Sequence, residues 1–289
     1  MYYDMPLYRP PSEADSLIFQ VTLGCSHNRC AFCIAYRRKK FRIRPWEDLK
    51  PDILEMALSL RDARRIFLAD GDALVIDTDY LLQILSFLYE KFPFLERVSA
   101  YASPGNLLEK SEAELAKIRQ AGLQLLYFGI ESGNDEVLTN ARKGANAKEL
   151  IQSAKKAIDA GFLLSATIIL GLGGKKESLP HAIETARVCS AINPHYLSAL
   201  TLMIEDGNRY FFHCMGKDWE MMDKLEILKE LRTMIEHFEL ENCIFRSNHA
   251  SNYLPIKANL NQDKARLLQE IDGALQNPAL LRPEFLRAL

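Results

Sequence analysis

The sequence predicts an α/β fold whose parallel strands form a sheet that curls into a barrel or part of one. Short apolar segments alternate with longer segments that have apolar residues at helical spacing. Strands joined by helices of ten or more residues pair in parallel through right-handed crossovers. Polar and glycine-rich segments directly follow the strands, where such barrels carry their active sites. A doubly wound sheet is the competing architecture, and it would also place ligands at the strand ends.

Composition limits the classes of protein to consider. The chain has 289 residues, of which 48% are hydrophobic and 26% are charged, and its formal net charge is −2. This is a globular composition, long enough to bury a core without disulfide bridges, and it has no overall basic field for nucleic acid. No segment has transmembrane length, and the first residues lack a signal-peptide pattern. We therefore expect a cytoplasmic protein that does not bind a membrane.

The elements are expected in a regular order. A Pro-rich N-terminal arm, 1–16, precedes a buried strand that ends at Gly24, and Pro45 opens the first long helix. Later helices begin at capping residues such as Ser111 and end at glycines such as Gly122. Strands are expected at 17–23, 65–69, 98–102, 125–130, 163–170 and 196–204, with a short one at 243–246. Helices are expected at 45–60, 79–92, 111–121, 147–160, 178–192, 219–239 and 262–275. Residues 17–205 would form the barrel, and a C-terminal helical extension, 206–289, would close it.

Three cysteines lie within nine residues directly after the first strand. Cys25, Cys30 and Cys33 have the spacing C-x4-C-x2-C. In a chain of this size and composition, such clustering favours metal ligation over disulfides. No fourth cysteine follows nearby, so three thiolates would leave one coordination position open, which indicates chemistry rather than a structural role. The remaining cysteines are interpreted as small buried apolar residues: Cys189, Cys214 and Cys243.

Three kinds of metal centre can be considered for this loop. Structural zinc needs four ligands, and His27 could be the fourth only with a strained loop. A plant-type ferredoxin has the same spacing, but its distant fourth cysteine would here be Cys189, five strand–helix units away. The third possibility is a cluster of four irons and four sulfides, held by three thiolates, with one iron available to a chelating ligand.

Further polar residues follow the other strands. Asp70 and Asp72 flank Gly71 after the second strand, and Glu131 follows the fourth. Taken singly, each of these acids could be a helix cap or a solvated loop residue. The glycines that begin at Gly171, after the fifth strand, could form only a tight turn. The cations Arg142 and Lys143 could be an exposed pair at a helix end.

Together these motifs resemble the radical S-adenosylmethionine (radical SAM) superfamily, over roughly residues 17–205. The resemblance rests on the cysteine loop, on Asp70-Gly71-Asp72, on the run from Gly129 to Asp135 and on Ile168 to Gly174. The run from Gly129 to Asp135 is similar to the corresponding motif of the branch that includes tRNA methylthiotransferases and coproporphyrinogen dehydrogenases. The usual cysteine spacing is C-x3-C-x2-C, so this chain has one additional residue. The resemblance implies a partial (β/α)6 TIM-like barrel that uses a 4Fe-4S cluster and S-adenosylmethionine.

The resemblance also implies roles for individual residues. The cluster would be held by Cys25, Cys30 and Cys33. Asp70 or Asp72 would accept from the amino group of S-adenosylmethionine, and Glu131 would bond its ribose hydroxyls. The methionine carboxylate and the adenine would be contacted by the remaining candidates: Arg142 and Lys143 for the carboxylate, Phe32 and Gly171 for the adenine.

The implied activity is oxygen-sensitive radical chemistry. One electron from a flavodoxin- or ferredoxin-like donor would cleave S-adenosylmethionine, and the resulting radical would take a hydrogen atom from a substrate. No RNA-binding or cobalamin module is visible, which favours a small-molecule substrate. A tRNA-modifying radical SAM enzyme is one alternative. An iron–sulfur protein that transfers electrons or senses redox state without cleaving S-adenosylmethionine is another, and it would need none of the strand-end acids.

Two further segments have candidate roles. The basic run 37–44 is expected to be a solvated surface or a docking site for an acidic electron donor, with RNA contact as the alternative. The polar run 246–253 is expected to close the open end of the barrel. Within it, His249 and Tyr253 are candidate catalytic residues that could relay a proton. The alternative for this run is a hydrogen-bonded surface turn.

Overall fold

The computed structural model describes residues 3–205 and 208–288, and it confirms the α/β class. The strands are β1 (Leu17–Gln20), β2 (Thr22–Leu23), β3 (Arg42–Ile43), β4 (Arg65–Ala69), β5 (Arg97–Ala102), β6 (Leu123–Glu131), β7 (Leu163–Leu170), β8 (Tyr196–Thr201), β9 (Cys243–Arg246) and β10 (Lys257–Leu260). The α-helices are α1 (Trp46–Ser59), α2 (Thr78–Lys91), α3 (Pro104–Glu109), α4 (Glu112–Gln120), α5 (Asp135–Asn140), α6 (Ala147–Asp159), α7 (Gly174–Ile192), α8 (Arg209–Met215), α9 (Lys224–His237) and α10 (Lys264–Gln276).

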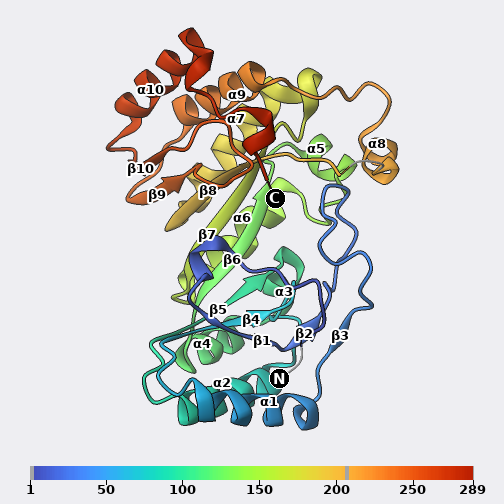
Figure 1. Ribbon diagram of the computed structural model, residues 1–289, viewed down its shortest axis with the longest axis vertical. Helices are drawn as coiled ribbons and strands as arrows, with labels where there is room; N and C mark the ends of the chain where they lie inside the picture. The colour runs from blue at the N-terminus through green and yellow to red at the C-terminus, as the bar shows by residue number, and fades with distance from the viewer. Residues whose placement is uncertain (1–2, 206–207, 289) are drawn as a thin grey trace. The chain divides into compact units, whose positions relative to one another are not determined.

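Eight of the strands form one sheet in the order β1-β4-β5-β6-β7-β8-β9-β10 (Figure 1). The pairs β1–β4, β4–β5, β5–β6, β7–β8 and β8–β9 are parallel. The last pair, β9–β10, is antiparallel, and β2 and β3 form a separate antiparallel ribbon. This sequential parallel order is what repeated strand–helix units produce.

The chain divides into two compact units. The first unit comprises Met1–Asn28, Cys33–Phe128 and Ser153–Leu164, and the second comprises Arg29–Phe32, Gly129–Gln152 and Ser165–Leu289. The domain limits expected at residues 16 and 205 stay predictions.

In the first unit, α1, α2 and α4 lie along one face of the strands (Figure 1). Large side chains such as Phe19, Phe67 and Phe92 are fully buried in its core. Burial of each such side chain contributes roughly 1.5–3 kcal/mol. The Asp77 side chain accepts from two backbone amides at the start of α2, and Ser111 caps α4 in a capping box. These caps are the signals that place both helices at the expected positions.

The N-terminal arm is fixed to the first unit by a buried carboxylate. Glu13 is fully buried, and it accepts hydrogen bonds from Tyr127 Oη at 2.6 Å, from Arg97 Nη2 at 2.7 Å and from Ser16. A segment expected to lie over the surface thus sends one acidic side chain into the interior, where the Arg97 guanidinium compensates its charge.

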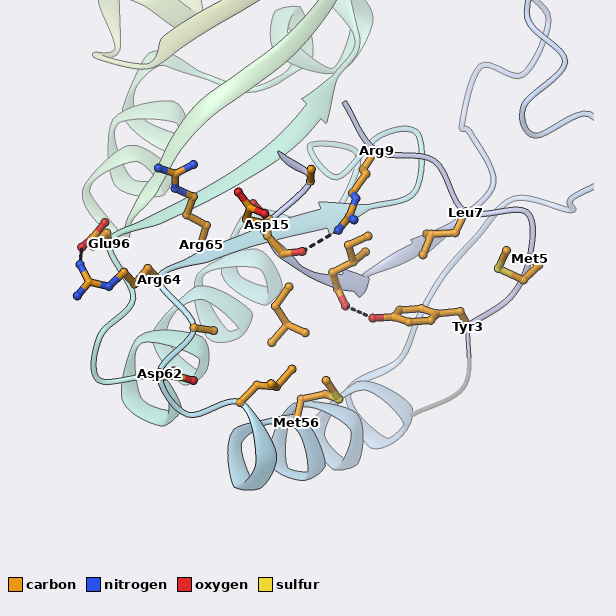
Figure 2. Close-up of a pocket in the computed structure, with 16 residues that line it drawn as sticks. Tyr3, Met5, Leu7, Arg9, Asp15, Met56, Asp62, Arg64, Arg65 and Glu96 are labelled. Atoms are coloured by element: carbon orange, nitrogen blue, oxygen red, sulfur yellow. Dashed lines mark hydrogen bonds and ion pairs between the residues drawn. The ribbon is translucent and has the colours of Figure 1, made fainter. Parts of the chain in front are cut away.

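A cavity of about 1080 Å³ lies beside the arm in the first unit (Figure 2). Among the side chains that line it are Tyr3, Arg9, Met56 and Arg65. Its lining includes the first residues of β1 and β4, whereas the cysteine loop follows the other end of the strands. The cavity is therefore separate from the site predicted from the sequence.

In the second unit, α9 packs against both α7 and α10. The expected helix 219–239 is wrong at its start, because the helix begins only at Lys224, after the capping residue Asp223. Three short helices, α3 in the first unit and α5 and α8 in the second, and the strands β3 and β10 were not predicted. Helices of six or seven residues make fewer than two turns, which is too short for a recognisable period. The extension after residue 205 therefore adds strands to the sheet as well as helices.

Two expected strands are also shorter than predicted. The first ends at Gln20, and β2 starts again after Val21, whose amide donates to the Ala69 carbonyl at 2.6 Å. The strand expected at 196–204 ends at Thr201. None of the helices within the described ranges is long and apolar enough to cross a bilayer.

Candidate cofactor site

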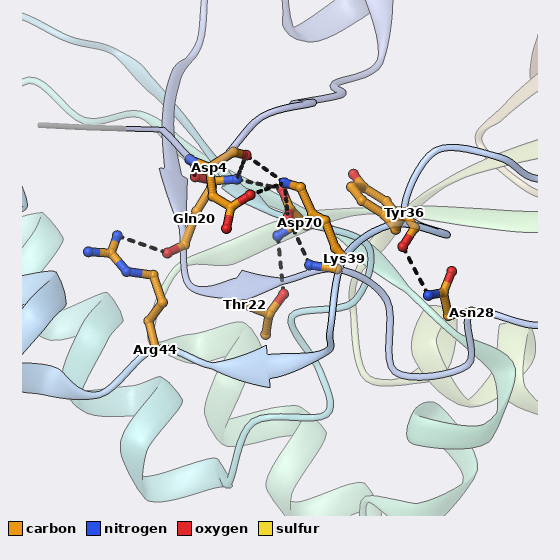
Figure 3. Close-up of polar contacts among 9 residues, drawn as sticks. Asp4, Gln20, Thr22, Asn28, Tyr36, Lys39, Arg44 and Asp70 are labelled. Carbon is orange, nitrogen blue, oxygen red and sulfur yellow. Dashed lines mark hydrogen bonds and ion pairs between the residues drawn. The ribbon is translucent and has the colours of Figure 1, made fainter.

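Asp70, the first residue after β4, is engaged entirely within the first unit (Figure 3). It is fully buried. Its Oδ1 accepts from Gln20 Nε2, and its Oδ2 accepts from the Gly24 amide and from Lys39 Nζ, each at 2.9 Å. Gly24 directly precedes the cysteine loop, so Asp70 fixes the point at which this loop leaves β2. With its oxygens occupied in this way, Asp70 is not oriented toward a ligand.

Asp72 is the acid of this turn that retains a vacant oxygen. Its Oδ2 accepts from Ser26 Oγ at 2.8 Å and from Asn106 Nδ2. Its Oδ1 is buried and has no hydrogen-bond partner among the described residues. Burial raises the pKa of this carboxyl, although Ser26, Ser103 and Asn106 favour its charged form. An unpaired buried acceptor costs about 1–3 kcal/mol, which a bound donor would recover.

Gly71 lies between the two acids and is in close contact with the cysteine loop. A Cβ added there would lie 2.8 Å from Cys25 Cβ and 3.0 Å from Tyr36 Cε2. The Gly71 amide also donates to the Gly24 carbonyl at 3.0 Å. Only glycine allows the turn after β4 to approach the first cysteine this closely.

Tyr36 provides a second vacant polar group beside this turn. The side chain is buried, and its hydroxyl has no hydrogen-bond partner in the described part of the chain. Burial is the main cause that raises its pKa, with smaller contributions from Asp70, Cys33 and Cys25. A neutral donor close to two of the predicted ligand cysteines suits a site for a sulfur-rich or anionic group.

The cysteine loop contains a left-handed residue between its first two cysteines. Asn28 has φ 42°, and its side-chain amide donates to the Tyr36 carbonyl at 2.9 Å. Asparagine tolerates this backbone region better than most residues. Cys25 and Cys33, which flank this part of the loop in the first unit, are partly exposed.

Cys30 belongs to the second unit, where its neighbours are held by two short helices. The Ala31 amide donates to the Ala141 carbonyl at 2.8 Å, and Asn208 Nδ2 donates to the Ala31 carbonyl at 3.4 Å. Tyr210 Oη donates to the Arg29 carbonyl at 3.3 Å. Ala31 is buried in an apolar cluster with Val137, Ala141, Leu172, Phe211 and Met215, and Phe32 packs against this cluster.

The donor chemistry of the loop fits an iron–sulfur cluster. Three partly exposed thiols on one loop are soft ligands of the kind that hold iron–sulfur centres. The vacant oxygens of Asp72 and Tyr36 lie in the unit that carries two of these thiols. Within residues 3–205 and 208–288, no three His, Cys, Asp or Glu side chains converge on a single metal ion.

In the second unit, Glu131 and Lys143 form an ion pair. Glu131, the last residue of β6, has φ 64°, and its Oε1 accepts from Lys143 Nζ at 3.1 Å. A Cβ at Gly129 would lie 2.0 Å from this Oε1 and 2.8 Å from Nζ, so glycine makes room for the pair. Arg142 is exposed, and a hydrogen bond to Cys214 raises the pKa of its guanidinium. Glu131, predicted to bond the ribose, and Lys143, predicted to bond the methionine carboxylate, thus contact each other.

The glycine turn after β7 is held by the segment that leads into α9. Gly171 has φ 80°, and its amide donates to Glu230 Oε1 at 2.6 Å. Trp219 Nε1 donates to the Leu172 carbonyl at 3.0 Å, and the amide of the residue after Gly174 donates to the Glu220 carbonyl at 3.0 Å. Sequence reasoning missed Glu230. The available signal was an acid on the apolar face of a predicted helix, among Ile227, Leu231 and Met234.

His181 links this turn to the one after β6. It is fully buried, its Nε2 donates to the Ile169 carbonyl at 3.1 Å, and its Nδ1 lies 2.8 Å from Ser132 Oγ. Its Nε2 is also 3.7 Å from Glu230 Oε1. Burial raises the pKa of Glu230, whereas His181 acts in the opposite direction.

His249 and Tyr253 lie in a loop that the C-terminal tail holds in place. His249 Nδ1 accepts from the Ser251 amide at 3.1 Å. Tyr253 Oη donates to Glu284 Oε2 at 2.8 Å and accepts from Arg287 Nη1 at 2.6 Å. Burial lowers the pKa of His249 and raises that of Tyr253 to about 12. These contacts are those of a hydrogen-bonded turn, and the proton-relay role stays a prediction.

Comparisons with known proteins agree with this arrangement of motifs. A family model described as the Radical SAM superfamily matches residues 19–186. The heme chaperone HemW of Bacillus subtilis is 25% identical over 158 residues, which cover 54% of this chain and 41% of that protein. A putative methylthiotransferase of Methanocaldococcus jannaschii is 27% identical over 156 residues, covering 51% and 33%. The matches thus span less than half the length of these curated relatives.

Two solved structures show the same fold. Methylornithine synthase (PylB) superposes with a TM-score of 0.53 at 17% identity, covering 89% of this chain and 80% of that one. Coproporphyrinogen III oxidase (HemN) from Escherichia coli superposes with a TM-score of 0.56 at 20% identity, covering 76% and 52%. At these identities the likeness concerns the fold alone, and it confirms the partial TIM-like barrel predicted from the sequence.

Proposed function

Because the chain belongs to the radical SAM superfamily, we propose that it is an enzyme that cleaves S-adenosylmethionine reductively to take a hydrogen atom from a small-molecule substrate. Members of this family use a 4Fe-4S cluster and S-adenosylmethionine. The observation that carries the proposal for this chain is the buried, unpartnered Oδ1 of Asp72, on the turn that contacts Cys25 through Gly71. When bound, the cluster and S-adenosylmethionine supply reductive carbon–sulfur cleavage, which is beyond the reach of protein side chains.

Asp72 is proposed to bind the amino group of S-adenosylmethionine. A carboxylate that is buried with one vacant oxygen suits an ammonium, because the cation compensates a charge already removed from water. Cys25, Cys30 and Cys33 are proposed to ligate the cluster. Asp70 is assigned the supporting role of holding Gly24.

The adenosine half is proposed to bind to residues of the second unit. Glu131 would accept from the ribose hydroxyls, and Lys143 or Arg142 would bond the methionine carboxylate. Glu131 and Lys143 contact each other at 3.1 Å, which keeps both partly buried charges compensated. Phe32 and Gly171 would contact the adenine.

The family needs a reductant, and we propose an acidic flavodoxin- or ferredoxin-like donor. Arg38, Lys40 and Arg42 are exposed on the segment directly after the cysteine loop. Positive charge close to the cluster would steer an acidic donor to the place where electrons must enter. The cytosol is the compartment we propose, because its reducing thiol pool keeps cluster cysteines reduced.

The proposal of a small-molecule substrate draws on one structural match that covers most of both chains. That protein is named methylornithine synthase, and it shares 89% of this chain and 80% of its own length in the superposition. The tRNA-modifying alternative rests on the match to the putative methylthiotransferase. That match covers only 33% of the length of the methylthiotransferase. A protein that only transfers electrons would have no use for the vacant oxygen of Asp72.

Anaerobic reconstitution tests the proposal. We expect about four irons per chain, and release of 5′-deoxyadenosine when S-adenosylmethionine and dithionite are added. Cys30→Ser is the control, and it should lose both. Two irons, bound zinc, or an intact reduced cluster without cleavage would overturn the proposal.

The substrate class is tested by stimulation of this cleavage. A small-molecule extract should accelerate 5′-deoxyadenosine release, because substrate binding completes the site, whereas total tRNA should not. Acceleration by tRNA alone would replace the small-molecule assignment with the tRNA-modifying one.

A further inference from the structure

We infer that Glu230, a buried carboxylate on α9, is a positioning residue that holds the two strand-end turns of the proposed adenosine site. The inference rests on the proposed function, because these turns carry Glu131 and Gly171. Glu230 does not itself reach a ligand, since its side chain is fully buried. It acts through the backbone and the side chains that it bonds.

The first contact of Glu230 is with the turn after β7. Its Oε1 accepts from the Gly171 amide at 2.6 Å, and its Oε2 accepts from Ser178 Oγ on α7 at 2.6 Å. Ile227, one helical turn earlier on α9, also packs closely against Gly171. A Cβ added at Gly171 would lie 2.6 Å from Ile227 Cδ1. The backbone of Gly171, at φ 80°, is therefore fixed by one hydrogen bond and one steric contact from the same helix.

The second contact leads to the turn after β6. Glu230 Oε1 lies 3.7 Å from His181 Nε2, and His181 Nδ1 lies 2.8 Å from Ser132 Oγ. Ser132 directly follows Glu131, and its Oγ accepts from the Asn134 amide at 3.0 Å. Glu230 thus bonds the turn after β7 directly, and it reaches the turn after β6 through an electrostatic contact with His181, which is itself hydrogen-bonded to Ile169 and Ser132. Buried polar groups of this kind fix geometry when every member has partners.

A role in packing alone does not account for this carboxylate. The neighbouring positions on the same face of α9 are Ile227, Leu228, Leu231 and Met234. Burying a carboxylate among them is costly, and an apolar residue of similar volume would often be at least as stable. What the carboxylate adds is an acceptor for the Gly171 amide, at a strand end where the next residues leave the sheet.

The position of Gly171 also matters to the cysteine loop. Leu172 follows it and is buried in the apolar cluster that contains Ala31, the residue after Cys30. A shift of the turn would therefore change the packing beneath a proposed cluster ligand as well as the contact with adenine. Misplacement by about 1 Å can reduce a rate by roughly 100-fold.

Three variants separate positioning from stability. Glu230→Leu keeps the volume but removes both acceptors. Glu230→Gln keeps an acceptor for the Gly171 amide and can donate to Ser178 Oγ. Ser178→Ala is the matched control, because it removes a bond from the same carboxylate without touching either turn.

The first measurement is amide hydrogen exchange of the protein without cluster or ligand. Glu230→Leu should speed exchange at 131–136 and 169–176, while Glu230→Gln and Ser178→Ala should leave 131–136 as in the wild type. Unchanged exchange at both turns in Glu230→Leu would overturn the inference, as would equal acceleration in Ser178→Ala.

The second measurement is binding of S-adenosylmethionine to the reconstituted protein. Glu230→Leu should raise the Kd and the KM for S-adenosylmethionine about tenfold or more at unchanged iron content, and Glu230→Gln should restore both to within about threefold. A wild-type Kd in Glu230→Leu would defeat the inference and leave the proposed function intact. If the wild type with about four irons neither binds nor cleaves S-adenosylmethionine, the proposed function fails, while the exchange result still reports on Glu230.

Discussion

At the scale of single residues, two acids separated by one glycine have opposite tasks. Asp70 bonds Gln20, Gly24 and Lys39, whereas Asp72 keeps a vacant oxygen. The sequence predicts both as candidate ligands, because both follow β4. It could not separate them, since the direction of each side chain depends on partners 46 to 50 residues away in sequence, such as Gly24 and Gln20.

Asp72→Asn should weaken binding of S-adenosylmethionine without unfolding the protein. A charge-assisted hydrogen bond is worth about 1.5–3 kcal/mol, so we expect the Kd to rise about tenfold or more. Burial raises the pKa of Asp72, so the folded state loses stability as pH rises above the unfolded pKa. The amide removes this penalty, and the Tm at pH 7–8 should equal or exceed that of the wild type. Equilibrium dialysis and calorimetry measure the two effects.

Asp70→Asn provides the contrast within the same turn. It removes the closer of the two carboxylates that pair with the buried Lys39 ammonium and leaves only Asp4, at 3.5 Å, and breaking a buried pair costs up to roughly 3–5 kcal/mol. We expect a lower Tm and fewer irons per chain after reconstitution, because asparagine offers one acceptor oxygen where Asp70 offers two to Gln20, Gly24 and Lys39. Identical behaviour of the two variants would contradict the division of roles.

At the scale of secondary-structure elements, the turns after the strands determine where the candidate ligands lie. Long periodic segments such as β4 and β7 occur at the residues predicted for them. The short helices α5 and α8 were missed, although they hold the residues around Cys30. Glu230 and His181 were missed for a different reason. Their contacts depend on how α9 packs on α7, which no local pattern encodes.

Gly71→Ala should reduce cluster assembly. The new Cβ would lie 2.8 Å from Cys25 Cβ, so this proposed ligand must move. We expect the iron content to fall by more than half, measured after anaerobic reconstitution. Gly273→Ala in α10 is the control, because nothing lies within 4 Å of its Cβ, and it should gain roughly 0.5–1 kcal/mol of stability with normal iron content. Normal iron content in Gly71→Ala would show that this contact is not needed.

Glu230→Gln should change how stability depends on pH. The folded pKa of Glu230 is raised mainly by burial, so its contribution is present below the unfolded pKa and is lost as pH rises through the folded value. The glutamine variant lacks this loss. Its free energy of unfolding relative to the wild type should therefore increase from about pH 4 to pH 8. Denaturant titrations at several pH values measure this difference, and a constant difference would contradict it.

At the scale of the whole molecule, the candidate residues are distributed over the two compact units. Asp72, Cys25 and Cys33 belong to the first, whereas Cys30, Glu131 and Lys143 belong to the second. From the sequence, these residues could be predicted only to follow successive strands of one sheet. The observed sheet order confirms the order of the strands. The division of the chain into two units depends on packing, which composition does not specify.

S-adenosylmethionine should raise the melting temperature of the cluster-loaded protein. A ligand at 100 times its Kd stabilises the folded state by about 2.7 kcal/mol, which corresponds to roughly 5 °C for a chain of this size. Anaerobic scanning calorimetry measures the shift. Cys30→Ser should show little of it, and an equal shift in that variant would mean that the ligand binds without the cluster.

The bonds that Asp70 makes have a consequence for biosynthesis. The ribosome completes Cys25, Cys30 and Cys33 long before Asp70, which fixes Gly24, and longer still before Asn208 and Tyr210, which hold the residues around Cys30. During translation, the nascent chain therefore carries three thiols on a loop that has not yet acquired its supports. Iron and sulfide are best delivered after release from the ribosome, so a strong cluster-assembly system that acts on the completed chain should give more loaded protein, whereas slower translation would prolong the unsupported stage.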